Sequence, residues 1–188
     1  TGNSVVHRTV RDLPSILRPG DVLVLNDTRV LHARLCSIRP TGGSAEVLLL
    51  RPVDGEALEG EPSDWEALVR PSRKVEAGTR LVVSEGLVVE VQDDLGEGRR
   101  LVRPMTSDGT PMGRLELLEA LDHYGTVPLP PYLTRGIEDP ERYQTVYSER
   151  SASAAAPTAG LHLTEEVLGA CQAAGVQIER LELLVGLD

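Results

Sequence analysis

The chain has 188 residues, of which 40% are hydrophobic, so it can bury a core as one domain or as two small domains. It contains no apolar run of about 18 residues that could span a bilayer, and residues 1–4 open neither a signal nor a transit peptide, so we expect a cytoplasmic, non-membrane protein. The net charge of -10 argues against a general nucleic-acid coat protein, although a local basic face is compatible with it.

The two cysteines, Cys36 and Cys171, lie far apart in the sequence. Neither has a second cysteine or a histidine at the spacing of a metal site, so the pattern indicates neither a disulfide framework nor a bound metal. Free cysteine is among the residues most often buried, and we expect both thiols to be buried.

The first elements are a short helical turn at 12–17 and an apolar run at 22–25, for which we predict a buried strand. The polar residues after this run stand where open α/β sheets place ligand contacts, at the end of a strand. A simple turn is the alternative, because such side chains often bond their own backbone. The resulting candidates for substrate binding are Asn26, Asp27, Thr28 and Arg29.

Between about Leu35 and Arg103 the sequence consists of short strand-like runs separated by turn signals. The runs are 46–50, 65–70, 80–83, 87–91 and 99–102. Their regular spacing predicts a small β-barrel or sandwich, and we expect an inserted antiparallel β-domain at 35–106. An acidic loop at 54–64 is expected to be solvated and mobile.

A compact cationic loop, Arg70-Pro71-Ser72-Arg73-Lys74, lies between two of these runs. Guanidinium and ammonium groups suit a phosphate or a carboxylate, so Arg70, Arg73 and Lys74 are candidates for substrate binding. A solvated turn is the alternative interpretation.

The helical pattern returns after the β-rich block. Thr110-Pro111 predicts a helix start, and leucines then recur at helical spacing as far as Gly125. The proline-rich segment 127–132 cannot be regular structure, because proline lacks a donor and restricts its predecessor. It is either a stiff wall of a site or a rigid connector.

The segment Ala154-Ala155-Ala156-Pro157-Thr158-Ala159-Gly160-Leu161-His162 delivers a histidine to the start of a helix through a run of small residues. Backbone can approach a ligand closely along such a run, and an imidazole beside it can serve as acid or base. Thr164 is the expected N-cap of the next helix, and Gly175 its left-handed end. An alternating strand at 176–185 completes an αβ unit.

These elements predict a mixed α/β (α+β) fold. Residues 1–34 and 107–188 form parts of one α/β domain, and the β-domain at 35–106 interrupts it. The sequence ends where a strand would deliver its loop, so we expect it to be a piece of a longer protein.

Six segments, in their order and spacing, resemble one family: the S-adenosylmethionine:tRNA ribosyltransferase-isomerases of queuosine biosynthesis. The segments are Arg18-Pro19-Gly20-Asp21 with Asn26-Asp27-Thr28-Arg29-Val30, Ala33-Arg34-Leu35, Arg70-Pro71-Ser72-Arg73-Lys74 with Gly78, Pro128-Leu129-Pro130-Pro131-Tyr132, Glu141-Arg142-Tyr143-Gln144-Thr145-Val146-Tyr147, and Ala155-Ala156-Pro157-Thr158-Ala159-Gly160-Leu161-His162. Each is weak evidence alone, whereas the set is specific and runs over nearly the whole chain. The chain would cover the middle half of such an enzyme, without an N-terminal segment and the C-terminal part of the catalytic domain.

The resemblance implies an α/β-barrel-like catalytic domain interrupted by a smaller β-domain. It also implies an enzyme that uses S-adenosylmethionine as a ribosyl donor. The ribosyl unit would pass to 7-aminomethyl-7-deazaguanine at the wobble position of tRNA and rearrange to epoxyqueuosine, with release of adenine and methionine. The partner would then be tRNA, and the oligomeric state is left open.

Within this resemblance His162 is the candidate for proton transfer, and a structural histidine that fixes the loop is the alternative. Glu165 and Glu166 suit the dipole of the first helical turn, and they favour a cationic sulfonium over a phosphate beside the loop. The implied cofactor-binding residues are Pro157, Thr158, Ala159 and Gly160, and the implied substrate contacts include Tyr132 and Tyr143.

The sequence departs from the family pattern at four positions. Leu163 stands in place of Phe, Ala152 in place of Gly, and both Thr126 and Leu184 in place of His. A site built around specific polar groups uses them to select its substrate. Loss of the two histidines can therefore change the substrate or abolish activity. Three hypotheses follow: an enzyme of this family, a related transferase with a small acceptor other than tRNA, and an inactive domain that keeps the cofactor pocket.

Overall fold

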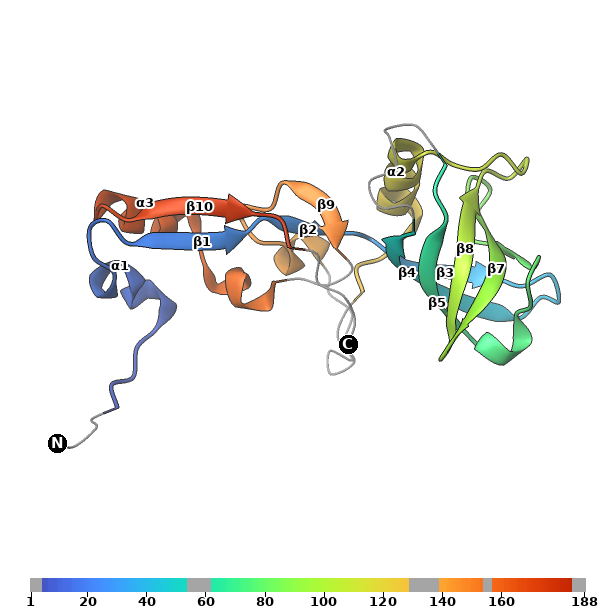
Figure 1. Cartoon of the computed structure of the whole chain (residues 1–188), viewed down its shortest axis with the longest axis horizontal. Coiled ribbons are helices and arrows are strands. Elements are labelled where there is room, and N and C mark those ends of the chain that lie inside the picture. Colours follow the sequence, from blue (N-terminus) through green and yellow to red (C-terminus); the bar gives the residue numbers. More distant parts are fainter. Residues whose placement is uncertain (1–4, 54–61, 129–138, 154–156, 184–188) are drawn as a thin grey trace. The chain divides into compact units, whose positions relative to one another are not determined.

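The computed structural model describes residues 5–53, 62–128, 139–153 and 157–183. The chain divides into two compact units, which are described one at a time. The α/β unit is built from the described residues of Thr1–Arg29, Ile137–Arg150 and Ala156–Leu183, and the barrel unit from those of Val30–Gly136 and Ser151–Ala155. Figure 1 labels the elements in chain order.

The barrel unit contains a closed antiparallel barrel, which confirms the predicted β-domain. Its strands are β3 (Arg34–Ile38), β4 (Ser44–Pro52), β5 (Trp65–Arg70), β6 (Arg80–Val82), β7 (Val88–Gly96) and β8 (Arg99–Met105). Around the barrel they follow the order β3-β4-β5-β8-β7-β6. Closure pairs every strand on both sides, so this sheet has no free edge. The first strand, β3, was not among the predicted runs.

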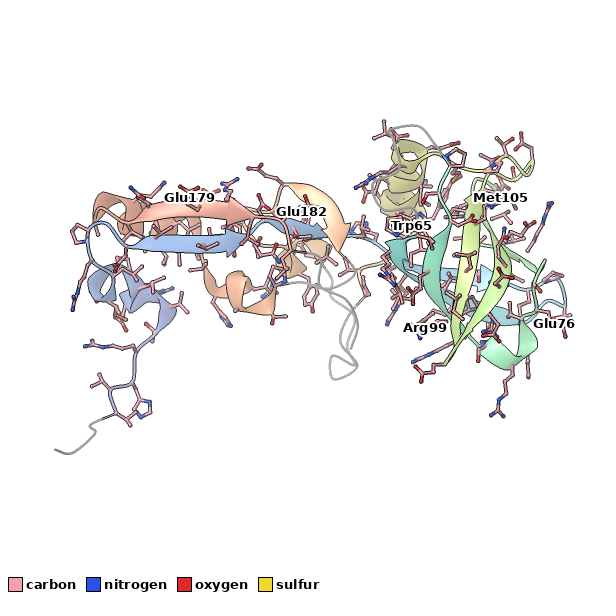
Figure 2. All side chains as sticks on the ribbon, in the orientation of Figure 1. Trp65, Glu76, Arg99, Met105, Glu179 and Glu182 are labelled. Carbon is pink, nitrogen blue, oxygen red and sulfur yellow. The ribbon has the colours of Figure 1, made fainter. Side chains whose placement is uncertain are left out.

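The inside of the barrel is filled by side chains that alternate along the strands. Trp65, labelled in Figure 2, is 6% exposed at the start of β5. Side chains that share this core include Leu35, Val47, Leu49, Val69, Leu81, Val89, Val91 and Val102. The short helix η2 (Ser72–Lys74) follows β5, and Val75 after it is 2% exposed in the same core.

Helix α2 (Arg114–Tyr124) packs on the barrel, because Leu117, Ala120 and Leu121 belong to the same buried cluster as the strands. The sequence placed this helix with the α/β domain at 107–188. In the structure it belongs to the barrel unit, because its apolar face is covered by the barrel core.

Helix α2 also begins later than predicted. Its N-cap is Gly113, not Thr110. Thr110 instead closes a tight turn, in which its N–H donates to Thr106 Oγ1 at 3.1 Å, and Pro111 pairs with Met105. The predicted end of the helix at Gly125 is confirmed.

Most of the predicted acidic loop, residues 54–61, lies outside the described residues. Asp64 is described, and it is not a solvated loop residue. Its carboxylate accepts hydrogen bonds from Arg103 Nε and Nη2 at 2.6 and 2.7 Å, and its side chain is 18% exposed. This fork-like pairing holds Asp64 against β8 and raises the pKa of Arg103 above its usual value.

The α/β unit contains a parallel pair of strands, β1 (Val22–Asn26) and β10 (Gln177–Leu181), which confirms the mixed α/β class. Closure of this unit into a barrel-like domain stays a prediction. The helices are η1 (Val10–Asp12), α1 (Leu13–Ile16), η3 (Pro140–Tyr143), η4 (Thr158–His162) and α3 (Glu165–Ala173). Two further strands of the chain, β2 (Thr28–Val30) and β9 (Arg150–Ser153), pair with each other and do not belong wholly to the α/β unit.

Two predictions of burial were wrong. Strand β1 is not buried on both faces, since Val22 is 50% and Val24 is 55% exposed while Leu25 is 4% exposed. The buried face of β1 packs toward α3, and the other face carries the exposed valines. Cys36 points out of the barrel and is exposed, whereas Cys171 is buried as predicted. Among the described residues no helix is long and apolar enough to cross a membrane.

Candidate functional site

The described part of the small-residue segment forms one turn of 3-10 helix, η4. The Gly160 N–H donates to Pro157 O at 2.8 Å, and the Leu163 N–H donates to Gly160 O at 3.0 Å. Thr158 and Ala159 are exposed, whereas Gly160 is buried. The turn therefore presents backbone with little side-chain bulk on its outer side and is anchored through its glycine. Residues 154–156 lie outside the described residues.

The anchor of the turn is a buried tyrosine. A Cβ atom on Gly160 would lie 2.2 Å from Tyr147 Oη and 3.0 Å from Thr145 Cγ2, so the phenol sits directly against the glycine. Tyr147 is 6% and Thr145 is 5% exposed. Burial raises the pKa of the Tyr147 phenol above its usual value, which keeps this group neutral. No local sequence pattern predicts this contact.

His162 ends the turn and is exposed. Among the described residues its imidazole has no hydrogen-bond or ion-pair partner, so both ring nitrogens can reach a ligand. Two residues later Thr164 caps α3 as predicted, because its hydroxyl accepts the Val167 N–H at 3.2 Å. Gly175 follows the helix with φ of 85°, as the predicted left-handed end requires.

The polar residues after β1 are partly committed to structure. Asn26 Oδ1 accepts the Thr28 hydroxyl at 2.6 Å and the Leu183 N–H at 3.1 Å, and Asn26 Nδ2 donates to Leu183 O at 3.1 Å. Thr28 is 1% exposed. These bonds tie the end of β1 to the segment after β10, so they favour the structural interpretation for Asn26 and Thr28.

The two charged residues of this cluster differ. The Asp27 backbone joins two segments, since its N–H donates to Leu181 O at 3.1 Å and its carbonyl accepts the Glu149 N–H at 2.9 Å. Among the described residues the Asp27 carboxylate has no partner. The Arg29 guanidinium, by contrast, pairs with Glu141 on η3. Asp27 is therefore the side chain of the cluster that is available for a ligand.

Of the two candidate tyrosines, Tyr132 lies outside the described residues. Tyr143 ends η3 and is 6% exposed. Asp139 caps this short helix by accepting the Glu141 N–H at 3.1 Å. Tyr143 therefore helps to pack the α/β unit, and its role as a substrate contact stays a prediction.

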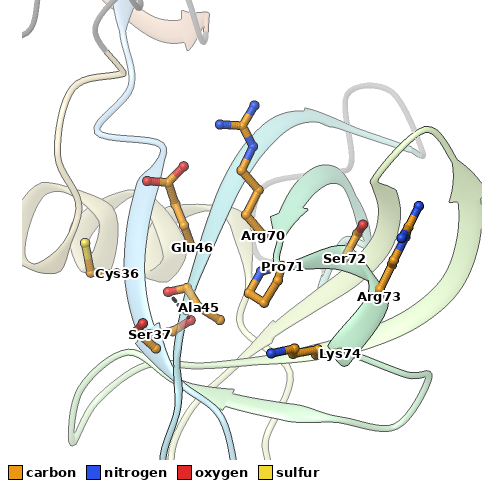
Figure 3. Close-up of a pocket in the computed structure, with 10 residues that line it drawn as sticks. Cys36, Ser37, Ala45, Glu46, Arg70, Pro71, Ser72, Arg73 and Lys74 are labelled. Atoms are coloured by element: carbon orange, nitrogen blue, oxygen red, sulfur yellow. Dashed lines mark hydrogen bonds between the residues drawn. The ribbon is translucent and has the colours of Figure 1, made fainter.

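The cationic loop lines an open hollow of about 800 Å³ on the barrel unit (Figure 3). One wall is formed by β3 and β4, and the other by the end of β5 and η2. The lining residues are Cys36, Ser37, Ser44, Ala45, Glu46, Arg70, Pro71, Ser72, Arg73 and Lys74. The predicted cations are thus brought together, on one hollow of the barrel unit.

A second hollow, of about 310 Å³, lies in the α/β unit and was not predicted. It is lined by Leu25, Val146, Tyr147, Glu165, Leu168, Gly169, Gln172, Ile178 and Arg180. Gly169 stands in the middle of α3 and has open space where a side chain would be. A glycine inside a helical pattern was the available signal, because it weakens a helix unless packing or function needs it.

Comparison with known proteins identifies the family. Residues 1–188 match the family model described as queuosine biosynthesis protein. The chain belongs to this family. The predicted resemblance is therefore confirmed over the whole chain.

Several curated relatives carry the same enzyme name. The chain is 47% identical over 186 residues to the S-adenosylmethionine:tRNA ribosyltransferase-isomerase of Symbiobacterium thermophilum, covering 98% of this chain and 50% of that protein. It is 44% identical over 189 residues to the enzyme of the same name from Clostridioides difficile, covering 100% and 51%. The chain thus spans about half the length of the curated relatives it matches.

One similar solved structure is the crystal structure of S-adenosylmethionine tRNA ribosyltransferase from Thermotoga maritima. The identity is 27%, the match covers 94% of this chain and 44% of that chain, and the TM-score is 0.37.

The structure also places one departure from the family pattern. Thr126, which stands where the family resemblance expects His, is exposed in the barrel unit. Its N–H donates to Arg34 O at 2.9 Å, and the Arg34 N–H donates to Thr126 O at 3.1 Å. This position therefore supports the entry into β3 through its backbone. Leu184 lies outside the described residues. Within the described residues no cluster of His, Cys, Asp or Glu side chains could hold a metal ion.

Proposed function

We propose that this chain is the part of an S-adenosylmethionine:tRNA ribosyltransferase-isomerase that holds the ribosyl donor. The observation that carries the proposal is the family match over residues 1–188, joined to a turn of small exposed residues that ends in an imidazole without a partner among the described residues. The reaction would transfer the ribosyl unit to 7-aminomethyl-7-deazaguanine in tRNA and form epoxyqueuosine, adenine and methionine. A cytoplasmic location is part of the proposal.

The chemistry of the donor fits this turn. A sulfonium acidifies the adjacent ribose 5′ carbon, so the reaction needs a base there and an acid for the departing adenine. Thr158 and Ala159 leave room for the ribose to approach the backbone, and His162 at the end of the turn supplies an imidazole that can accept or donate a proton. Glu165 and Glu166 follow in the first turn of α3, where their charges favour a cationic ligand.

A second function is a related transferase with a small acceptor other than tRNA. It is favoured by two observations: the net charge of -10, and the replacement of two expected family histidines by Thr126 and Leu184. A cofactor-binding domain without activity is the third possibility for the same sequence.

Release of adenine from S-adenosylmethionine by the intact protein distinguishes these functions. We expect release with tRNA that carries the deazaguanine precursor and none without it. Release with a small acceptor alone would support the second function. No release under any condition would contradict both enzymatic functions.

The role of His162 is tested in the same assay. His162→Ala should lower the rate of adenine release at least about a hundredfold, which is the size of a general acid–base contribution. His7→Ala is the matched control, since it removes an exposed histidine outside the turn and should leave the rate unchanged. A near-normal rate for His162→Ala would show that this imidazole only shapes the loop.

A further inference from the structure

Most arginines of the barrel strands are neutralised by a neighbouring carboxylate. Carboxylate oxygens lie within 4.0 Å of these arginine side chains: Arg34, Arg51, Arg80, Arg99, Arg100 and Arg103. Among the described residues, no such partner lies beside Arg70, Arg73 or Lys74. Their charges are therefore uncompensated, and they gather on one hollow of a chain whose net charge is -10.

The turn that carries these cations is held in place from both sides. Arg100, 8% exposed, donates from Nη2 to Ser72 O at 3.0 Å, and its other terminal nitrogen pairs with Asp94. Val75 anchors the end of the turn in the barrel core. The cations thus stand on a fixed backbone, so less conformational entropy is lost when they bind an anion.

The cations do not converge on one point. In Figure 3 the Arg73 and Lys74 side chains leave η2 in different directions, with Lys74 directed toward the wall that carries Ser37 and Ala45. Arg70 stands beside Glu46, its register partner on β4. This arrangement suits neighbouring phosphates along a chain better than a single small anion, which would need its donors to face a common centre.

We propose that this hollow binds the sugar–phosphate backbone of the RNA substrate, with Arg73 and Lys74 on neighbouring phosphates. This inference rests on the proposed function, and it assigns a part of the RNA contact to the barrel unit. Glu46 is the acidic side chain in the wall. Its carboxylate lies 3.8 Å from Arg34 Nε, and Arg70 on β5 is the register partner of Glu46. Arg34 therefore offsets Glu46, while Arg73 and Lys74 have no carboxylate partner among the described residues and are available for phosphate.

Backbone contacts of this kind orient an RNA without reading its sequence. They also make binding depend on salt, because each neutralised phosphate releases counterions. The affinity of the hollow should therefore fall as the salt concentration rises, and the slope of that dependence reports the number of phosphates bound.

The test measures binding of precursor tRNA to the intact protein at several salt concentrations. The double variant Arg73→Gln/Lys74→Gln should lower the slope of log affinity against log salt by about 1.5, since each phosphate contact contributes about 0.7 to 0.9. Its affinity should fall at least about tenfold at physiological salt. The control Arg80→Gln/Arg114→Gln removes the same charge from residues of the barrel unit that do not line the hollow. Equal losses in both double variants, or no loss in the first, would overturn the proposal.

A second measurement needs no variant. Cys36 is exposed on the wall of the hollow, whereas Cys171 is buried. Bound tRNA should slow the alkylation of Cys36 at least about tenfold, as measured by mass spectrometry of the peptide that contains it. Free methionine, at a concentration equal to that of the tRNA phosphates, should not slow it. Protection by methionine and not by tRNA would instead make the hollow a carboxylate site.

Failure of this inference is distinct from failure of the proposed function. If adenine release still requires tRNA while the Arg73→Gln/Lys74→Gln variant binds tRNA normally, the enzyme function stands and the hollow is not the RNA contact. If the protein neither releases adenine nor binds tRNA, both are wrong. If tRNA binds through the hollow without adenine release, the RNA contact stands and the enzyme function falls.

Discussion

The phenol oxygen of Tyr147 occupies the space that any side chain at Gly160 would need. A Cβ atom there would lie 2.2 Å from Tyr147 Oη. Gly160 is not among the glycines with positive φ, so the requirement for glycine at this position is steric and does not come from the backbone conformation. The turn that carries His162 is therefore positioned by the packing of the Tyr147 phenol against the Gly160 backbone.

Gly160→Ala should destabilise the protein by about 1–3 kcal/mol, the usual cost of forcing an extra methyl into a packed site. Tyr147→Phe removes the nearest atom, which leaves Thr145 Cγ2 at 3.0 Å and the ring carbon Cζ at 3.3 Å from the added Cβ. The double variant Gly160→Ala/Tyr147→Phe should therefore be more stable than Gly160→Ala alone. Urea unfolding of the single and double variants measures both effects.

Gly169→Ala is the matched control for that substitution. It also adds a methyl to a glycine of the α/β unit, but nothing lies within 4 Å of the added atom. Because alanine is the better helix former, this variant should gain about 0.5–1 kcal/mol. Equal effects at positions 160 and 169 would contradict the packing role of Tyr147.

Gly125→Ala should be more destabilising than Gly160→Ala. The added Cβ would meet two backbone oxygens, His32 O at 1.9 Å and Leu121 O at 2.6 Å, and backbone cannot rotate away as a side chain can. We expect a loss above about 3 kcal/mol. Trp65 is the one tryptophan of the chain and lies in the barrel core, so its fluorescence during urea unfolding reports this loss directly.

The barrel should lose stability in acid through Glu66. Hydrogen bonds from Arg51 at 2.9 Å and Arg99 at 3.0 Å lower the pKa of this carboxyl below its usual value, against the opposing effect of burial. A lowered folded-state pKa means that the stabilisation is complete above the unfolded pKa near 4.5 and is lost as the pH falls through the folded pKa.

Glu66→Gln should therefore cost about 1–2 kcal/mol at pH 7, because charged hydrogen bonds are replaced by weaker ones to partly exposed arginines. At a pH below the folded pKa of Glu66 the variant and the wild type should converge. Glu119→Gln, at an exposed position of α2, serves as the control and should leave the pH dependence unchanged. A constant gap between the Glu66→Gln curve and the wild-type curve at all pH values would contradict this account.

Thr164→Ala should weaken the start of α3. The Thr164 hydroxyl satisfies the Val167 N–H, and loss of such a cap costs about 1 kcal/mol. Amide exchange at Val167 should become faster, whereas Thr164→Ser keeps the hydroxyl and should preserve the protection. If the serine and alanine variants exchange alike, the capping bond does not stabilise this helix.

Local patterns predicted the parts of the fold that local physics decides. The barrel strands follow from alternation and turn signals, and the N-cap at Thr164 follows from its hydroxyl before a helical pattern. The prediction of a fully buried β1 was wrong, because a run of consecutive valines and leucines does not distinguish a strand covered on both faces from one covered on a single face. Strand β3 was missed because exposed Cys36 and Ile38 alternate with buried residues around a polar Ser37.

In the candidate site, too, local features were predicted and contacts between distant segments were not. The small residues of the turn were predicted to leave space, and the cations of η2 were predicted to act together. The support of Gly160 by Tyr147, and the opposite wall of the barrel hollow around Ala45, depend on which distant segments meet. No single-sequence pattern encodes such pairs, because side-chain spacing constrains only neighbours on one element.

The parallel pairing of β1 with β10 gives the protein an order of assembly. Asn26 and Leu183, which hydrogen-bond at the end of this pair, are 157 positions apart, whereas the bond from Ser37 to Ala45 across β3 and β4 spans 8 positions. Contacts of short separation lose less loop entropy and form sooner. The barrel can therefore fold while the ribosome is still adding residues, whereas β1 has no parallel partner until β10 has been synthesised.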